Sequence, residues 1–195
     1  MKKDLAELKE DILFSADIRD IVLDFRSTWG LFSPAHVDEG SRLLIEEMEI
    51  KPGDRVLDLG CGYGAIGLYA AKLASPGEVH LIDKDFVAVE YAAKNARLNG
   101  ISNAKAYLSN GLSNVPDIKF DVIVSNLPAK VSKELFEILF RDAREHLNPG
   151  GKFYAVAIAG LKEYLKRSFK EVFGNYEKVR QGRAYAVSLA RKILK

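Results

Sequence analysis

The stretch of sequence that decides the fold covers residues 56–67 and reads Val56-Leu57-Asp58-Leu59-Gly60-Cys61-Gly62-Tyr63-Gly64-Ala65-Ile66-Gly67. Its apolar beginning is typical of a buried strand, and we predict a helix from Ala65 onward. Glycines alternate with other residues between the two, and glycine adopts the left-handed backbone of tight turns at little cost. A glycine turn from a strand into a helix favours a ligand site at the carboxyl end of the strand, in an open α/β sheet.

Predicted helices and strands alternate on both sides of this turn. The strands are expected at 55–59, 79–82, 104–108, 120–125 and 153–159, and the helices at 38–48, 65–74, 85–98, 132–147 and 161–173. Asp38 and Asp85 are the expected caps at the starts of two of these helices. Two further strands, 176–180 and 184–190, flank a turn so short that only antiparallel neighbours can share it. The pattern predicts a three-layer doubly wound α/β fold whose parallel sheet ends with one antiparallel strand.

Residues 1–37 differ from the rest of the chain. A charged amphipathic start, 1–13, precedes a strand predicted over 18–27 and a loop with two aromatic residues, Trp29 and Phe32. We therefore distinguish an N-terminal helix and strand extension, residues 1–37, from a main domain, residues 38–195, and expect them to form one structural unit.

Composition excludes several classes of protein. Of the 195 residues, 48% are hydrophobic and 29% are charged, a balance that excludes wholesale disorder. Cys61 is the single cysteine, which excludes a disulfide framework and a cysteine-rich zinc site. No apolar run approaches the roughly 20 residues of a membrane-spanning helix, and the N-terminus lacks the apolar segment of a signal peptide. We expect a cytoplasmic protein with no metal and no membrane association.

Two classes of cofactor compete for the glycine turn. Gly60, Gly62 and Ala65 fit a dinucleotide fingerprint loosely, in which backbone N–H groups bind a pyrophosphate. Asp58 argues against that class, because a carboxylate repels a pyrophosphate but attracts the ammonium group of S-adenosylmethionine. Asp83 ends the next strand about 20 residues later, where a carboxylate binds ribose hydroxyls. The two acids favour S-adenosylmethionine, and a domain with a glycine turn but no nucleotide is the alternative.

The sequence resembles the class I S-adenosylmethionine-dependent methyltransferases, and among them the small-domain family of the ribosomal small-subunit guanine-N2 methyltransferase C and its stand-alone archaeal relatives. The resemblance covers residues 18–190 and rests on 56–67 together with Gly30-Leu31-Phe32-Ser33, Val37-Asp38-Glu39-Gly40-Ser41-Arg42-Leu43-Leu44, Asp83, Ala88, Asn95, Asn99-Gly100 and Phe120-Asp121-Val122-Ile123-Val124-Ser125-Asn126. It implies S-adenosyl-L-methionine as cofactor, with residues 38–195 as the domain that binds it. It also implies a Rossmann-like sheet of order 3-2-1-4-5-7-6 with strand 7 antiparallel.

Family members that methylate planar amino groups end the fourth strand with Asn-Pro-Pro and an aromatic or aliphatic residue. The asparagine oxygen and the next carbonyl accept the two N–H bonds of the amine, which aims its lone pair at the methyl group. This chain reads Asn126-Leu127-Pro128-Ala129-Lys130. The resemblance assigns catalysis to the first three residues, although Leu127 replaces a proline and Ala129 cannot stack on a base. A strand-end cap is the alternative role of Asn126.

The remaining candidate residues surround this corner. The resemblance and the glycine turn give the cofactor-binding set Asp58, Gly60, Cys61, Gly62, Gly64, Asp83 and Asn110. Asn110 stands where an acid is expected near the adenine amine, and its side-chain oxygen can accept the same hydrogen bond. An ordinary Asn-Gly turn is the alternative there. Phe32 and Lys130 are the candidates for substrate contact, and the scattered histidines predict no metal site.

The positive charge of the C-terminal part of the chain indicates what kind of partner the protein could bind. Residues 161–195 carry ten Lys/Arg and three Asp/Glu, a net charge of +7, whereas the other residues sum to −5. An anionic partner would explain this, and a solvated helix face is the alternative. We expect N-methylation of an RNA base amine, in ribosomal RNA by resemblance and not in DNA. Two further hypotheses are a methyltransferase for a small molecule or a protein amide, and a cofactor-binding RNA or partner module with little catalysis.

Overall fold

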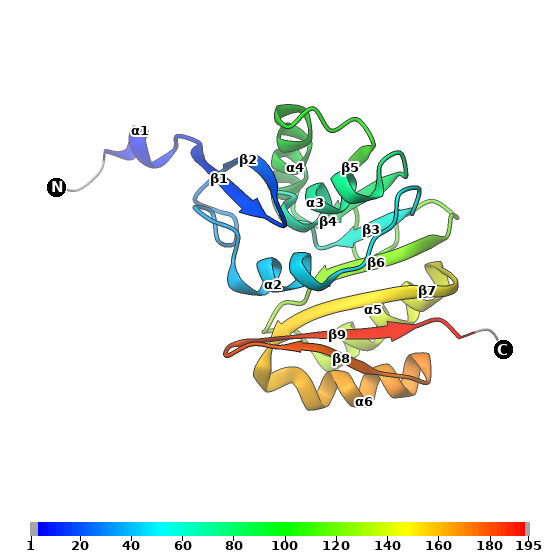
Figure 1. Cartoon of the computed structure of the whole chain (residues 1–195). Coiled ribbons are helices and arrows are strands. Elements are labelled where there is room, and N and C mark those ends of the chain that lie inside the picture. Colours follow the sequence, from blue (N-terminus) through cyan, green and yellow to red (C-terminus); the bar gives the residue numbers. More distant parts are fainter. Residues whose placement is uncertain (1–3, 194–195) are drawn as a thin grey trace.

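The central sheet of the computed structural model, which describes residues 4–193, contains seven strands in the order β5-β4-β3-β6-β7-β9-β8 (Figure 1). Their bounds are Val56–Leu59 for β3, Val79–Asp83 for β4, Ala104–Leu108 for β5, Phe120–Asn126 for β6, Leu147–Ile158 for β7, Glu177–Gln181 for β8 and Tyr185–Arg191 for β9. Numbered within the sheet, the order is 3-2-1-4-5-7-6. Strand β9 pairs antiparallel with both β7 and β8, which confirms the predicted fold class.

Helices cover both faces of this sheet. One face carries α2 (Glu39–Glu47), α3 (Ala65–Ala74) and α4 (Phe86–Leu98), and the other carries α5 (Lys133–His146) and α6 (Lys162–Phe173), as Figure 1 shows. A 3₁₀ turn, Ala159–Leu161, precedes α6, and a short helix, α1 (Leu5–Leu8), lies near the N-terminus. The side chains of Asp38 and Asp85 accept backbone N–H bonds at the starts of α2 and α4, as predicted.

Each face has its own apolar core. Leu68 of α3 and Ala92 of α4 pack over β3 and β4 on the first face. On the second face, Phe140 of α5 and Phe169 of α6 lie edge to face at 5.1 Å between ring centroids, over Phe153 of β7. Burying such a side chain contributes about 1.5–3 kcal/mol. Strand β3 lies between these cores and is buried at every position, which makes its one charged residue, Asp58, conspicuous.

A two-stranded antiparallel sheet precedes α2. It consists of β1 (Ile12–Ile18) and β2 (Ile21–Ser27), whereas the sequence predicted one strand, 18–27, after a charged start. The prediction missed β1 because its turn lacks the usual Asn-Gly or Asp-Gly signal: Arg19 and Asp20 adopt φ angles of 57° and 60°. Strand β7 also begins earlier than predicted, because Leu147 already pairs with Phe120 of β6, and residues 148–151 form an irregularity before the pairing resumes at Lys152.

Two asparagines, one in α4 and one directly after it, hold this hairpin against the domain. Asn95 accepts the N–H of Arg26 at 2.7 Å and donates to its carbonyl at 2.9 Å, and Asn99 makes the same pair of bonds with Asp24. Each side-chain amide thus replaces a neighbouring strand at the outer edge of β2. Phe25 packs into the same core as α3. These contacts join the hairpin of β1 and β2 to α4 and to the core over α3.

Candidate functional site

The glycine turn lies at the carboxyl end of β3. Gly60, Gly62 and Gly64 have φ angles of 77°, 55° and 94°, which disfavour any side chain. A Cβ atom on Gly60 or Gly62 would meet nothing within 4 Å, so the backbone there borders open space. Gly64 instead starts α3 and packs inward, because a Cβ on it would lie 3.2 Å from Leu81. The first two glycines leave room for a ligand to approach the backbone.

Asp58 lies wholly buried beneath this turn. Its Oδ2 accepts the N–H of Gly67 at 2.7 Å, whereas its Oδ1 has no partner among residues 4–193. Burial raises the pKa of Asp58 to about 7, and the bond from Gly67 opposes this shift. A buried carboxyl oxygen without a partner is unfavourable unless a ligand supplies a donor. The geometry therefore fits a group that brings an N–H, such as an ammonium.

Asp83 joins the end of β4 to the same turn. One carboxylate oxygen accepts the N–H of Gly62 at 2.9 Å and the other accepts the N–H of Asp85 at 3.0 Å. Since a carboxylate has about four acceptor sites, both oxygens retain capacity for hydroxyl groups. Cys61 is buried, and burial raises the pKa of its thiol, so it is a neutral packing residue rather than a nucleophile.

Asn110 lies beyond the end of β5, the neighbour of β4. The N–H of Ser109 donates to the carbonyl of Asp83 at 2.8 Å, which continues the pairing of the two strands up to this point. Asn110 itself is exposed, and its side chain has no hydrogen bond within the described part of the chain. It is placed where a ligand that spans the ends of β4 and β5 could use it.

Asn126 ends β6 and faces the start of α2. Its Nδ2 lies 3.0 Å from Oγ of Ser41 and 3.3 Å from each carboxylate oxygen of Asp38. Because a carboxylate only accepts hydrogen bonds, the nitrogen must be the atom that faces Asp38. The side-chain oxygen of Asn126 then has no partner within residues 4–193. The sequence predicted Asp38 as a helix cap and missed its contact with Asn126, for which the only signal is the Asp-x-Gly-Ser spacing.

The residues after Asn126 differ in burial. Leu127 is buried, and its N–H donates to the carbonyl of Val156 on β7 at 2.8 Å, which fixes the peptide that follows Asn126. Pro128, Ala129 and Lys130 are exposed. The start of this motif is thus part of the sheet, and its end forms the surface beside it.

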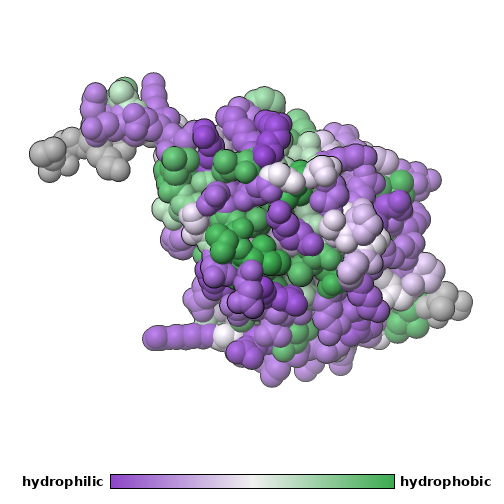
Figure 2. Space-filling model, turned by 45° about the horizontal axis from the view of Figure 1, so that its top comes forward, coloured by the Kyte–Doolittle hydropathy of each residue, from purple (hydrophilic) through white to green (hydrophobic). Residues whose placement is uncertain are grey.

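The loop that carries Phe32 rests on the glycine turn. The hydroxyl groups of Ser33 and Tyr63 both donate to the carbonyl of His36, at 2.7 and 3.1 Å. Phe32 itself is 69% exposed and Trp29 is 70% exposed. Figure 2 shows apolar residues gathered near the middle of one face, with polar residues around them. The loop offers exposed aromatic rings on an anchored backbone.

These contacts bring most of the predicted site to one edge. Strands β4 and β6 flank β3 in parallel, so Asp58, Asp83 and Asn126 lie at neighbouring carboxyl ends.

The basic residues of the C-terminal part differ in their surroundings. The turn that contains Arg183 borders α2, since a Cβ on Gly182 would lie 3.5 Å from Leu43. Other cations are paired with acids: Arg180 lies 3.7 Å from Glu47, and Arg167 lies 3.9 Å from Glu171. These pairs offset part of the positive charge in the C-terminal part of the chain.

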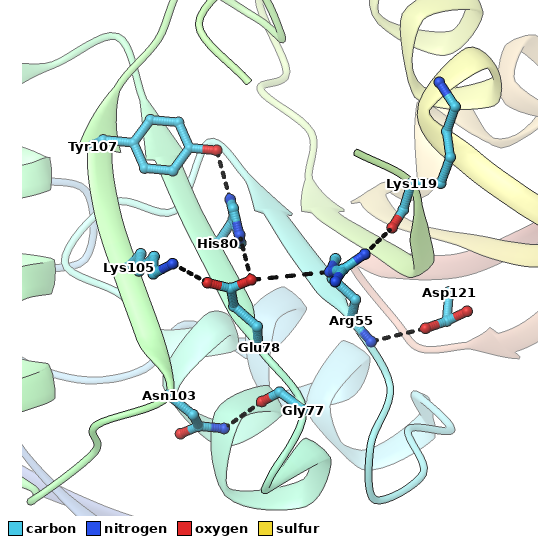
Figure 3. Close-up of polar contacts among 9 residues, drawn as sticks. All are labelled: Arg55, Gly77, Glu78, His80, Asn103, Lys105, Tyr107, Lys119 and Asp121. Atoms are coloured by element: carbon cyan, nitrogen blue, oxygen red, sulfur yellow. Dashed lines mark hydrogen bonds and ion pairs between the residues drawn. The ribbon is translucent and has the colours of Figure 1, made fainter. Parts of the chain in front are cut away.

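The amino-terminal edge of the sheet holds a separate polar cluster (Figure 3). Glu78 forms ion pairs with Lys105 and Arg55 and lies 3.4 Å from Nε2 of His80. Nδ1 of His80 lies 2.8 Å from the hydroxyl of Tyr107, and burial lowers the pKa of this histidine. The cluster ties the starts of β3, β4 and β5 together and contains no predicted site residue.

Residues 4–193 contain no group of three or more His, Cys, Asp or Glu side chains that could hold a metal ion. None of their helices combines the length and apolar character needed to cross a membrane.

Comparisons with known proteins give consistent relatives. The family described as "Methyltransferase small domain" matches residues 22–188. YbxB of Bacillus subtilis is 36% identical over 186 residues, which are 92% of this chain and 91% of YbxB. Ribosomal RNA small subunit methyltransferase C of Hamiltonella defensa is 34% identical over 162 residues, 81% of this chain and 47% of that protein.

A solved structure agrees with these relatives. The 16S rRNA N2 G1207 methyltransferase of T. thermophilus, in complex with AdoMet and guanosine, has a TM-score of 0.83 and 29% identity. The match covers 93% of this chain and 50% of that one. The chain thus spans about half the length of the ribosomal RNA methyltransferases that it matches.

Proposed function

The chain belongs to the methyltransferase small domain family and contains an S-adenosylmethionine-dependent methyltransferase domain, and on that premise we propose that it methylates an amino group of an RNA base. The observation that carries this proposal is Asn126, which lies at the same sheet edge as the glycine turn. Its amide nitrogen is occupied, and its oxygen has no partner within residues 4–193. Relatives named as ribosomal RNA methyltransferases make ribosomal RNA the leading substrate.

The residues around the glycine turn fit the cofactor. The open backbone at Gly60 and Gly62 would border it, and the unpartnered oxygen of Asp58 suits its ammonium group. Asp83 would accept bonds from the ribose hydroxyls and Asn110 from the adenine amine. Cys61 and Gly64 would shape the turn from below. When bound, the cofactor supplies an electrophilic methyl group, and the protein must then position the acceptor.

Positioning is the task of the motif that begins at Asn126. The lone pair of an exocyclic amine is delocalised into the base, so the amine is a weak nucleophile. The Asn126 oxygen and the Leu127 carbonyl would accept its two N–H bonds and hold it in one orientation. The bond from the Leu127 N–H to Val156 fixes the peptide between Asn126 and Leu127. Pro128 restricts the backbone of the residue before it, which carries the Leu127 carbonyl.

Base stacking must differ from that in family members whose motif ends with an aromatic residue, because Ala129 has no ring to stack on a base. We assign base stacking to Phe32, which is exposed on a loop anchored to the glycine turn. Lys130 would contact an RNA phosphate. The absence of a ring at residue 129 also favours a second candidate function, methylation of a small molecule or of a protein amide.

Transfer of a tritiated methyl group tests the proposal. Purified protein is incubated with labelled S-adenosylmethionine and, in separate reactions, deproteinised ribosomal RNA, small ribosomal subunits, a protein extract and a metabolite pool. We expect label in RNA, recovered after digestion as an N-methylated nucleoside, and no label with Asn126→Ala, which should still bind S-adenosylhomocysteine. Label confined to protein or metabolites would replace this function with the second candidate, and label in none of the pools would support a binding module.

A further inference from the structure

We propose that Asp38 and Ser41 are positioning residues, which hold the side-chain amide of Asn126 in the orientation that presents its oxygen to the acceptor amine. This inference rests on the proposed function, because in that function the side-chain oxygen of Asn126 accepts a hydrogen bond from the acceptor amine. The contacts are those of Nδ2 with Ser41 Oγ, at 3.0 Å, and with the Asp38 carboxylate, at 3.3 Å.

Asp38 is itself held in place by the helix that it caps. Its Oδ1 accepts the N–H of Gly40 at 3.0 Å and the N–H of Ser41 at 3.2 Å. The first turn of α2 packs closely on β9, since a Cβ on Gly40 would lie 2.7 Å from the ring of Tyr185. Asp38 and Ser41 are both buried. The carboxylate and the hydroxyl therefore form a rigid acceptor pair before any substrate binds.

A side-chain amide has two orientations that differ by exchange of its oxygen and nitrogen. Beside Asp38, one orientation places an N–H donor against a carboxylate, and the other places an oxygen against two carboxylate oxygens. The first is a charge-assisted hydrogen bond and the second is repulsive. Only the first leaves the Asn126 oxygen free for an amine N–H, so the clamp selects the orientation that the proposed reaction requires.

Other capping residues lack such a second role. Asp85 and Ser132 cap α4 and α5 through bonds to their own helices. Asp38 also reaches Asn126, 88 residues away in the chain, and it does so at the sheet edge where the glycine turn lies. This explains the Asp-x-Gly-Ser spacing: the acid caps and clamps, the glycine allows close packing on Tyr185, and the serine supplies the second acceptor.

Reciprocal substitutions test the clamp. Asp38→Asn keeps a good capping residue but lets the Asn126 amide rotate, so kcat should fall about tenfold while KM stays unchanged. Asn126→Asp places two carboxylates against each other and should lower kcat about 100-fold. The double variant restores one donor opposite one acceptor, and it should recover about tenfold over Asn126→Asp.

The controls separate positioning from structure. Asp54→Asn changes an aspartate that caps a turn at the opposite edge of the sheet, and it should leave kcat unchanged. Affinity for S-adenosylhomocysteine and the melting temperature should be the same for Asp38→Asn as for the natural protein. A joint loss of kcat, melting temperature and cofactor affinity in Asp38→Asn, or no recovery in the double variant, would overturn the proposal.

A measurement without acceptor substrate keeps this inference distinct from the proposed function. The side-chain amide protons of Asn126, followed by ¹⁵N NMR, should exchange slowly in the natural protein and rapidly in Asp38→Asn. Slow exchange combined with unlabelled RNA would support the clamp and refute the RNA substrate. Labelled RNA combined with full activity of Asp38→Asn, or fast exchange in the natural protein, would refute the clamp alone.

Discussion

The two edges of the same parallel strands satisfy their polar groups in different ways. At the amino-terminal edge, Glu78 pairs with Lys105, Arg55 and His80, all within the protein. At the carboxyl edge, the Asp58 Oδ1 and the Asn126 oxygen have no partner within residues 4–193. One edge therefore sets its charged groups against one another, whereas the other leaves acceptors for donors that a ligand brings. Substitutions at the first should change stability, and those at the second should change binding and catalysis.

The largest effect is expected for the dependence of stability on the titration of Asp58. This residue is an exception to the division above, because it lies at the carboxyl edge and still affects stability. Burial raises its pKa to about 7 from an ordinary value of 3.8. Between these pH values the folded state retains a proton that the unfolded state has lost. Stability therefore falls as pH rises from about 4 to 7, by up to about 4 kcal/mol. Urea unfolding of the natural protein and of Asp58→Asn across this range measures it.

The Asp58→Asn variant should lose this decline, so its stability relative to the natural protein should rise with pH. Parallel stability curves would contradict the prediction. An ammonium group bound to Asp58 would lower its pKa again, so cofactor binding near pH 6 should release protons. Calorimetry in two buffers with different heats of ionisation detects that release.

Asp83→Ala should sharpen the contrast by weakening cofactor binding. It removes the acceptor for the N–H groups of Gly62 and Asp85, as well as the proposed ribose bonds. We expect a loss of about 1.5–3 kcal/mol in affinity for S-adenosylhomocysteine, measured by calorimetric titration. Lys105→Ala, at the other edge, is the control and should bind normally. Equal affinities for Asp83→Ala and the natural protein would remove Asp83 from the cofactor site.

Substitution of Phe32 tests whether its ring stacks on a base in place of the ring that Ala129 lacks. Phe32→Ala should weaken RNA binding by about 1–3 kcal/mol, the value of one stacked base. Filter binding to ribosomal RNA fragments at several salt concentrations measures this. Ala129→Phe in the Phe32→Ala background should restore part of the affinity. Leu13→Ala changes an exposed apolar residue of the hairpin and should have no effect. An unchanged affinity in Phe32→Ala would exclude stacking by this residue.

The smallest effect is expected at the amino-terminal edge. Glu78→Gln removes the carboxylate that the ion pairs with Lys105 and Arg55 share, and these pairs are partly exposed and screened by solvent. We expect a loss of about 1 kcal/mol in the free energy of unfolding. Cofactor affinity should not change. The pKa of His80 should fall further, because Glu78 raises it, and an NMR titration would show this. A change in cofactor affinity would mean that the two edges are coupled.

Local patterns predicted most of the fold. The caps Asp38 and Asp85 and the glycine turn are signals within a few residues, and each agrees with the structure. Parallel order then determined that Asp83 and Asn126 lie at one edge. Strand β1 was missed because Arg19 and Asp20 form its turn with positive φ angles that their residue types do not indicate.

The clamp on Asn126 could not be predicted in the same way. It depends on how the start of α2 packs against β6, and no local pattern reports a contact across 88 residues. The complete burial of Asp58 is of the same kind, because it results from the packing of α3 over the sheet. The sequence predicted candidate residues for the site, but the hydrogen bonds among them depend on tertiary packing.

The asparagines in and directly after α4 have a consequence for protein engineering. Asn95 bonds both to the outer edge of β2 and, at 2.9 Å, to the carbonyl of Tyr63 in the glycine turn. A truncation that removes the hairpin would free this side chain from β2 and loosen the turn that it also holds. A truncation before residue 12 leaves these bonds intact. Fusion partners and purification tags therefore belong upstream of β1, where they leave the cofactor loop undisturbed.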